Sequence, residues 1–145
     1  MITNSIKVSA ECDEIPRRAT HGSAGYDLCA YEQEGGWHEI RPGEASRFKT
    51  GVSIEIPDGH CGLLFVRSSL GARGLVNATG VSVIDSDYRG DVIIVLRNIG
   101  GEDQVIRRGD RIAQIVIVPC LMTEMVQGEL SKTQRGDRGF GSTGR

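Results

Sequence analysis

The chain has 145 residues, a length that suits one compact domain with its own hydrophobic core. Its formal net charge of −2 argues against a nucleic-acid-binding protein, because affinity for a phosphate backbone needs a basic excess. No stretch approaches the length of a membrane span, and residues 1–10 lack the apolar core of a signal peptide, so we expect a cytoplasmic protein without membrane contact.

The spacing of the cysteines favours neither a metal site nor a redox motif. The chain contains four of them, and none belongs to a Cys-x-x-Cys pair: Cys12, Cys29, Cys61 and Cys120. The histidines do not complete a metal-ligand spacing with them. His60 and Cys61 are neighbours, but adjacent residues of a strand point to opposite faces, which argues against a thiol–imidazole pair. We therefore expect reduced thiols that pack as small apolar side chains.

Short runs of β-branched and apolar residues, separated by turn residues at close spacing, predict an all-β fold. Residues 52–56 alternate apolar and polar side chains, which indicates a strand with one buried face, and Pro57-Asp58-Gly59 predicts the turn that follows. Strands covered on both faces are indicated by the mostly apolar runs at 61–66, 91–96 and 111–118. One helical turn fits residues 70–75, where glycines disfavour a longer helix.

Residues 131–145 are rich in glycine and polar residues, with Phe140 as a lone aromatic residue. Such a composition buries too little apolar surface to offset the entropy of ordering, so we expect a flexible arm that follows a β domain over residues 1–130. A disordered tail is the simplest interpretation of this arm. Against it, Phe140 between glycines could cover a bound base by stacking.

Three carboxylates lie close together in the segment Ile84-Asp85-Ser86-Asp87-Tyr88-Arg89-Gly90-Asp91. A calcium loop is excluded, because Arg89 stands where an oxygen ligand belongs and Leu96 where the closing glutamate belongs. Two interpretations remain open. The segment is either a charged hairpin in solvent, or it places a carboxylate at the mouth of a buried hairpin as a general base, because partial desolvation raises the basicity of a carboxylate.

The segment Val66-Arg67-Ser68-Ser69-Leu70-Gly71 follows an apolar strand. Small hydroxyl residues and glycine at such a place can aim backbone N–H groups and hydroxyls at an anion, and Arg67 could add a bidentate phosphate contact. An ordinary strand-to-turn exit explains the same residues. Taken alone, the pattern somewhat favours the ordinary exit over a phosphate site.

Five segments, spread over nearly the whole chain, together resemble the motifs of the trimeric dUTPase family in the family's order. They are Ala24-Gly25-Tyr26-Asp27-Leu28, Arg67-Ser68-Ser69-Leu70-Gly71, residues 80–91, Gly109-Asp110-Arg111-Ile112-Ala113-Gln114, and residues 135–144. One such segment would be a weak signal, whereas five in order are specific. The resemblance implies a distorted jelly-roll or β-clip fold, a homotrimer whose active sites are each built from all three subunits, and Mg²⁺-dependent hydrolysis of dUTP to dUMP and pyrophosphate.

The resemblance also implies a role for each matching residue. Asp85 corresponds to the general base that activates water for attack on the α-phosphorus, Tyr88 to the residue beneath the deoxyribose, and Asp27 to a carboxylate near the water molecules of Mg²⁺. The residues that correspond to contacts with the base and the sugar are Gly80, Val81, Ser82, Val83, Ile84, Tyr88 and Phe140. The residues that correspond to contacts with the phosphates are Arg67, Ser68, Ser69, Gln114, Arg135, Gly141, Ser142 and Thr143. The reaction of the family supplies dUMP for dTTP synthesis and keeps uracil out of DNA.

Two positions depart from the family pattern, since Ser69 and Ser82 stand where glycine is common. Two rival functions also remain. A dCTP deaminase is related in fold and shares Arg-Ser-Ser, but the glutamate that it needs has no counterpart in the apolar strand around Val95. A catalytically inactive trimeric nucleotide-binding regulator is disfavoured by the intact Asp85 and by the intact arm.

Overall fold

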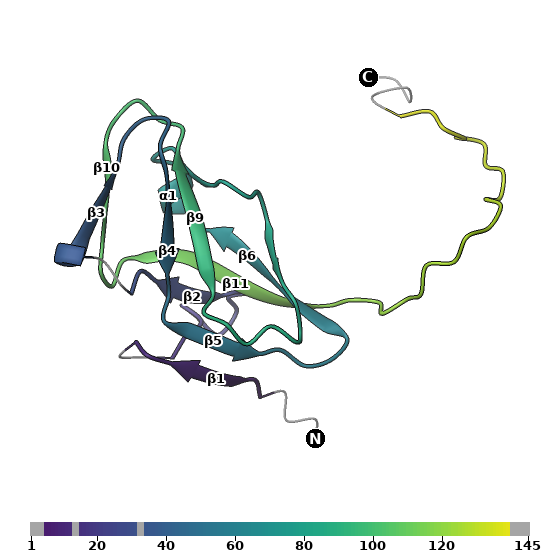
Figure 1. The fold of residues 1–145 in the computed structure, drawn as a ribbon, viewed down its shortest axis with the longest axis horizontal. Coiled ribbons are helices and arrows are strands. Elements are labelled where there is room, and N and C mark those ends of the chain that lie inside the picture. Colours follow the sequence, from purple (N-terminus) through teal and green to yellow (C-terminus); the bar gives the residue numbers. More distant parts are fainter. Residues whose placement is uncertain (1–4, 13–14, 32–33, 140–145) are drawn as a thin grey trace.

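The computed structural model describes residues 5–12, 15–31 and 34–139, in which antiparallel strands dominate, as predicted (Figure 1). The strands are β1 (Lys7–Ala10), β2 (Tyr26–Cys29), β3 (Trp37–Ile40), β4 (Ala45–Lys49), β5 (Val52–Glu55), β6 (His60–Val66), β7 (Leu75–Asn77), β8 (Ser82–Ile84), β9 (Ile93–Asn98), β10 (Gln104–Arg107) and β11 (Arg111–Pro119). A 3-10 helix, η1 (Glu34–Gly36), and one helical turn, α1 (Ser68–Gly71), interrupt them. Neither helix in this part of the chain has the length and apolarity that crossing a membrane requires.

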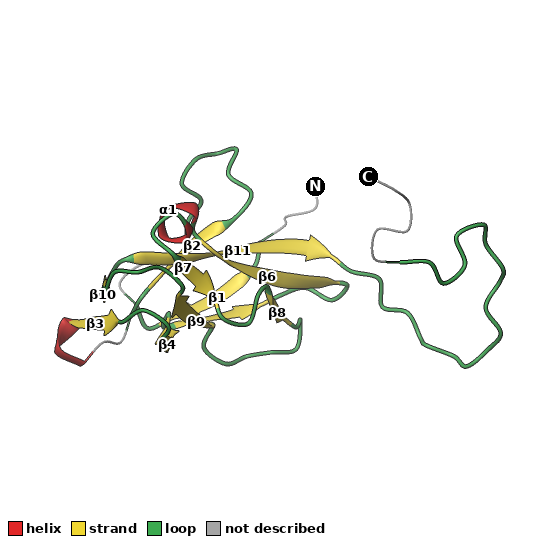
Figure 2. Cartoon of the chain, turned by 90° about the horizontal axis from the view of Figure 1, so that it is seen from above, coloured by secondary structure: helices red, strands yellow, loops and turns green. Residues whose placement is uncertain are grey.

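The strands form two main sheets and two ribbons (Figure 2). One sheet has the order β2-β11-β6-β8 and the other the order β4-β9-β7, while β1 pairs with β5 and β10 with β3. One core cluster draws on both sheets, with Leu28, Leu64 and Ile115 from the first and Ile94 and Leu96 from the second. Antiparallel sheets around a shared core give the distorted jelly roll that the resemblance implied.

The local sequence pattern predicts β5 and the turn after it correctly. Val52 and Ile54 are buried within the strand, and Ile56 is buried directly after it. The N–H of His60 donates to the carbonyl of Pro57 at 3.1 Å and closes the turn. Alternation therefore located both the strand and its buried face.

The outer face of β6 and β11 is less covered than the sequence predicted. Gly62 and Leu64 of β6 are buried, whereas Leu63 and Phe65 on the opposite face are only half-buried. An apolar run shows that a strand needs cover, but it does not show that the same chain provides the cover. We call the half-buried set the open sheet face, which comprises Leu63, Phe65, Val116 and Val118.

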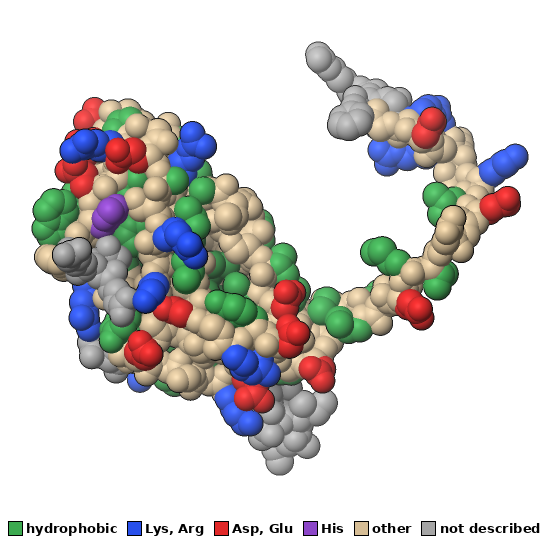
Figure 3. All heavy atoms as spheres, in the orientation of Figure 1, with side chains coloured by type: hydrophobic (Ala, Val, Ile, Leu, Met, Phe, Trp, Pro, Cys, Tyr) green, Lys and Arg blue, Asp and Glu red, His purple; other side chains and the backbone are tan. Residues whose placement is uncertain are grey.

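The packed domain ends at Cys120, whose N–H donates to the carbonyl of Gly59 at 2.8 Å. The described residues 121–139 form neither strand nor helix and lead away from the domain (Figure 1). Apolar side chains are strung along this segment (Figure 3), and Leu121, Met125 and Leu130 are 89%, 98% and 95% exposed. The extended part of the chain thus begins earlier than residue 131 and carries apolar surface that its own domain does not cover.

Candidate active site

Asp27 is the centre of a charged cluster that three elements build. It lies in β2, between Arg67 directly after β6 and Arg111 at the start of β11. Its Oδ1 atom is 3.2 Å from Nε of Arg67, and its Oδ2 atom is 3.1 Å from Nη1 of Arg111. The Asp27 side chain is only 17% exposed. Because two guanidinium groups face one carboxylate, the cluster keeps a net positive charge that would attract an anion.

Gln114 lies beside this cluster because β2 and β11 approach closely. It pairs with Asp27 on one side and with Phe65 of β6 on the other. A Cβ atom added to Gly25 would lie 2.7 Å from Oε1 of Gln114 and 3.3 Å from the carbonyl oxygen of Ile115. Glycine is therefore needed where the chain enters β2. The first and fourth predicted segments meet at this point, as the site requires.

Helical turn α1 presents Ser68 and Ser69 to solvent at the same end of β6. The first N–H groups of a helix have no acceptor within it, so the backbone and the hydroxyls of these serines can bind an anion together. Ser69 lies inside the helical turn, where serine is tolerated, which explains why glycine is not needed there. Of the predicted phosphate-binding residues, Arg67 and Gln114 lie beside Asp27, and Ser68 and Ser69 directly follow Arg67.

The loop 78–81 joins β7 to β8 and carries residues predicted to contact the base and sugar. Gly80 has a φ of 75°, a conformation that favours glycine. Val81 and Val83 are exposed, whereas the side chain of Ile84 is buried in the core. Only the backbone of Ile84 can therefore face a ligand.

A turn directly after β8 presents Asp85 to solvent. The N–H of Tyr88 donates to the carbonyl of Asp85 at 3.2 Å, which closes the turn. The guanidinium of Arg89 donates to the carbonyl groups of Ser86 at 2.6 Å and Tyr88 at 3.0 Å. These bonds hold the backbone and leave the Asp85 carboxylate accessible to a water molecule.

Asp91 has a structural role that the sequence did not reveal. Its Oδ1 atom accepts hydrogen bonds from the N–H groups of Thr50 at 3.2 Å and Val52 at 3.3 Å. It also lies 3.2 Å from the Thr50 hydroxyl, whose shorter bond goes to the carbonyl of Val92 at 2.8 Å. A carboxylate that accepts hydrogen bonds from two N–H groups of one loop is an anchor for that loop. Asp91 is therefore a poor candidate for the general base, and Asp85 and Asp87 remain.

Within one chain, Asp85 lies far from the charged cluster of Asp27, Arg67 and Arg111. Ile84 pairs with Gly62, so Asp85 lies level with Cys61 near the start of β6, whereas Arg67 follows the end of that strand. The separation is about six strand residues, or roughly 20 Å at about 3.3 Å per residue. If Asp85 is the general base and Arg67 holds the phosphates, as the resemblance implies, one triphosphate would not reach both residues of the same chain. One chain alone therefore does not bring the two groups together.

The described part of the arm contains a compact turn around Arg135 and Arg138. Nε of Arg135 donates to the carbonyl of Arg138 at 2.9 Å, and Nε of Arg138 donates to the carbonyl of Arg135 at 3.0 Å. Arg138 also donates to the carbonyl of Gln134. Four predicted residues lie outside the described part of the chain: Phe140, Gly141, Ser142 and Thr143.

The family model for dUTPase matches residues 12–144, which is nearly the whole chain. This chain belongs to the dUTPase family. A deoxyuridine 5'-triphosphate nucleotidohydrolase of Anaeromyxobacter sp. (strain Fw109-5) is 48% identical over 91% of this chain and 88% of its own length. The protein of the same description from Desulfitobacterium hafniense (strain DSM 10664 / DCB-2) is 43% identical over 97% of this chain and 98% of its own length.

Solved dUTPases share the fold. A mutant dUTPase of Staphylococcus bacteriophage 80alpha with dUpNHpp has a TM-score of 0.87 and 28% identity, and the match covers 99% of this chain and 100% of that one. A mutant dUTPase of phage phi11 of S. aureus has a TM-score of 0.77 and 26% identity, covers 88% and 98%, and is described with a structural Mg(II) ion. The family and the fold expected from the five segments are thereby confirmed.

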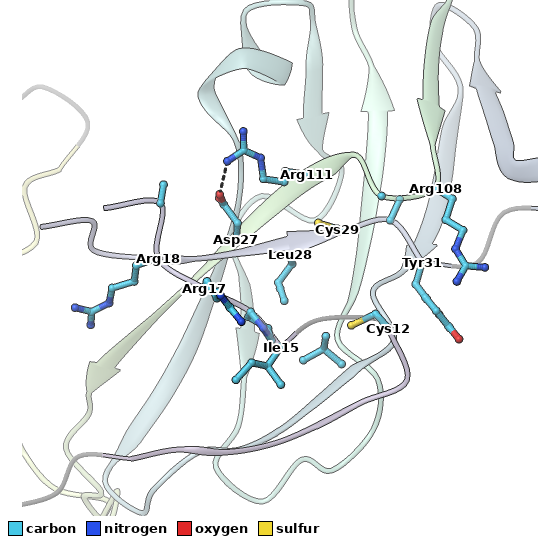
Figure 4. A pocket seen from close by; sticks show the side chains of 15 residues that line it. Cys12, Ile15, Arg17, Arg18, Asp27, Leu28, Cys29, Tyr31, Arg108 and Arg111 are labelled. Atoms are coloured by element: carbon cyan, nitrogen blue, oxygen red, sulfur yellow. Dashed lines mark hydrogen bonds and ion pairs between the residues drawn. The ribbon is translucent and has the colours of Figure 1, made fainter. Parts of the chain in front are cut away.

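A pocket of about 360 Å³ adjoins the charged cluster around Asp27 in this dUTPase family member (Figure 4). The N-terminal loop, β2 and the turn before β11 line it, with apolar walls that include Leu28 and Val52. Asp27 and Arg111 form part of its lining, whereas Asp85 does not. No sequence pattern indicated this pocket, because its walls come from segments that are far apart along the chain.

The residues around Asp27 would fit a magnesium ion only if the ion were bound mainly by the phosphates of a substrate and by water. The described residues contain no group of three or more His, Cys, Asp and Glu side chains that could hold a metal ion. Mg²⁺ keeps several water molecules and binds largely through substrate phosphates, so such a group is not required. Both oxygens of Asp27 already face arginines, which favours contact with the ion through water over direct coordination.

Proposed function

We propose that this protein is a dUTP diphosphatase, which hydrolyses dUTP to dUMP and pyrophosphate. The match to the dUTPase family over residues 12–144 carries the proposal. The relatives named above are deoxyuridine 5'-triphosphate nucleotidohydrolases, and the phage 80alpha dUTPase holds the nucleotide analogue dUpNHpp. Such an enzyme would work in the cytoplasm, where it supplies dUMP and keeps uracil out of DNA.

Asp85 is the general base in this proposal. Its exposed carboxylate takes a proton from a water molecule, whose oxygen forms a bond to the α-phosphorus. The bond from the α-phosphorus to the bridging oxygen breaks, and pyrophosphate leaves. Arg67, Ser68 and Gln114 orient the phosphates and stabilise the charge that develops on them. When bound, Mg²⁺ neutralises phosphate charge, and Asp27 would contact its water molecules.

The nucleoside end of the substrate lies against the third segment. Tyr88 packs beneath the deoxyribose, where a 2′-hydroxyl group would not fit. The backbone of residues 80–84 reads the uracil ring, with Val81 and Val83 exposed beside it. Phe140 then covers the base, while Arg135, Ser142 and Thr143 hold the γ-phosphate and close the arm over the site.

A homotrimer completes the site. Asp85 and Arg67 lie roughly 20 Å apart within one chain by their positions along β6, so a productive site takes them from different subunits. The open sheet face is an apolar surface that another subunit can cover. Leu121, Met125 and Leu130 need a similar cover. Contacts between subunits would therefore bury the apolar surface and assemble the catalytic groups at the same time.

Pyrophosphate release tests the proposal and separates it from its rivals. The purified protein with Mg²⁺ should release pyrophosphate from dUTP and no ammonia from dCTP. Ammonia release would favour a dCTP deaminase. Binding of dUTP without turnover would favour an inactive regulator. The Asp85→Asn protein is the control, since a contaminating phosphatase would be unaffected by that change.

A further inference from the structure

Three side chains at the base-reading loop form a closed ring of hydrogen bonds. Nδ2 of Asn77 lies 3.0 Å from Oγ of Ser82, which lies 2.7 Å from Oγ1 of Thr79. Oγ1 of Thr79 lies 2.8 Å from Oδ1 of Asn77, and the Thr79 N–H also donates to Oδ1 at 3.2 Å. Neither Asn77 nor Thr79 lies in any of the five segments that resemble the family motifs.

The direction of each bond in the ring follows from the chemistry of the groups. The Thr79 backbone N–H can only donate, so the atom it contacts is the amide oxygen of Asn77, and Nδ2 is the donor to Ser82. The Thr79 hydroxyl donates its one proton to Oδ1 and therefore accepts the proton of Ser82. The hydroxyl proton of Ser82 is thus used inside the ring and is not available to a bound base.

The ring connects the two sheets at the loop. Asn77 is the last residue of β7, where it pairs with Leu96 of the three-stranded sheet. Ser82 is the first residue of β8, where it pairs with Leu64 of the four-stranded sheet. Strand β8 is short and lies at the edge of its sheet, so ladder bonds hold it on one side only. The ring supplies a second attachment for the loop 78–81.

Asn77 is buried, with 9% exposure, so the ring also satisfies polar groups that would be costly to leave unpaired. A loop that recognises a base through its backbone discriminates between bases only if that backbone is fixed. We propose that Asn77 and Thr79 are positioning residues that hold the loop 78–81 in the conformation that recognises uracil. This inference rests on the proposed function. The inference also explains why residue 82 is serine, because the Ser82 hydroxyl closes the ring of hydrogen bonds, which a glycine at this position would leave open.

The tests use Asn77→Ala, Thr79→Val and the conservative rescue Thr79→Ser. Asn98 provides a matched control, because it is also a buried asparagine at the end of a strand. Its Nδ2 donates to the carbonyls of Ile40 at 2.9 Å and Glu102 at 2.8 Å. Asn98 lies at the other end of the β7–β9 pair, opposite Leu75, so Asn98→Ala should weaken the fold without disturbing the loop.

We expect Asn77→Ala to raise KM for dUTP about tenfold and to lower the preference for dUTP over dTTP by a similar factor, while kcat stays within about threefold, since several net hydrogen bonds are lost. Thr79→Val should show a smaller effect in the same direction, and Thr79→Ser should restore the wild-type values. Asn98→Ala should lower the melting temperature and leave KM and the preference unchanged.

Hydrogen exchange of the amides of residues 79–83 provides a readout that does not need catalysis. It should quicken in Asn77→Ala and Thr79→Val and stay unchanged in Asn98→Ala. Unchanged exchange and unchanged preference in both loop variants would overturn the inference. If Asn77→Ala does not fold, the Thr79 pair alone decides the outcome. A wild-type protein that releases no pyrophosphate from dUTP would refute the proposed function, and the exchange result would still show whether the ring fixes the loop.

Discussion

The phenolic hydroxyl of Tyr88 donates a hydrogen bond to the backbone carbonyl of Asp91 at 2.9 Å. The bond folds the ring over Gly90, where an added Cβ atom would collide with the ring and its hydroxyl. Tyr88 nevertheless remains 41% exposed. One side of the ring thus lies against the backbone, and the other can pack against a sugar.

Gly90→Ala should therefore impair the enzyme through Tyr88, although residue 90 carries no functional group. The displaced ring should raise KM for dUTP about tenfold or more and weaken the preference for dUTP over UTP. Tyr88→Phe loses only the hydrogen bond and should lower the preference for dUTP over UTP by about fivefold or less. Gly101→Ala is the control, because no atom lies near an added Cβ there. Equal kinetics of the two alanine variants would contradict the proposed role of the ring.

Asp85→Asn keeps the shape of the side chain and removes its basicity. We expect kcat to fall by roughly 10²-fold or more, in line with general-base contributions, with little change in the binding of dUTP. Asp87→Asn, two residues further along an exposed turn, is the matched control and should retain most of its activity. Near-normal turnover of Asp85→Asn together with a large loss in Asp87→Asn would move the base to Asp87.

Sites shared between subunits predict that two inactive variants can complement each other. Sedimentation equilibrium should first show a trimer. The trimers formed by co-refolding Asp85→Asn and Arg67→Ala chains in equal amounts should together regain about one quarter of the wild-type rate. About three quarters of them are mixed, and about one site in three of a mixed trimer takes both intact residues from different subunits. Neither variant alone should show this activity. Without recovery in verified mixed trimers, the two residues would have to act within one chain.

Local patterns in the sequence located four of the eleven strands in the described residues, β5, β6, β9 and β11, but not the partners of those strands. Alternation located β5, and turn residues located its end. The anchoring of Asp91 by Thr50 joins residues 41 positions apart and depends on how the loops meet. The two arginines that face Asp27 likewise come from other elements. Periodicity reports which face of a strand is apolar, whereas register and pairing decide which side chains meet across it.

The thiol of Cys61 reports on the neighbourhood of Asp85. Burial, the thiol of Cys120 and the negative charge of Asp85 raise the pKa of Cys61 above its ordinary value of 9.0. A raised pKa lowers the thiolate fraction at a given pH, so alkylation by iodoacetamide at pH 8 should be slower than for free cysteine and should quicken as the pH rises past 9.0. Peptide mapping by mass spectrometry would follow this residue.

Asp85→Asn should speed the alkylation of Cys61 only slightly at a fixed pH, since it removes the smallest of the causes that raise the pKa. A slower rate in this variant would contradict the sign of the effect.

Burial likewise raises the pKa of Cys29, so the folded chain holds that proton more tightly than the unfolded chain. Folding should therefore become less favourable as the pH rises through the ordinary value of 9.0.

The extended C-terminal segment divides into two parts of different composition. Residues 121–130 carry exposed apolar side chains, including Leu121, Met125 and Leu130. Residues 131–145 are mostly glycine, charged and hydroxyl residues, with Phe140 as their one large apolar side chain. The first part has surface to bury against another subunit, whereas the composition of the second offers few apolar contacts, so we expect its order to depend on a bound ligand.

Two truncations test this division. A chain that ends at Leu130 should keep its melting temperature and its trimer, yet lose most turnover of dUTP, because the γ-phosphate loses its clamp and water enters the site. A chain that ends at Cys120 should also lose trimer stability, since the apolar part is gone. Full activity of the chain that ends at Leu130 would show that residues 131–145 take no part in catalysis.

Within the full chain, Phe140→Ala should lower the turnover of dUTP less than Arg135→Ala does. Stacking on a base is worth about 1–3 kcal/mol, whereas the arginine neutralises a phosphate charge in a closed site.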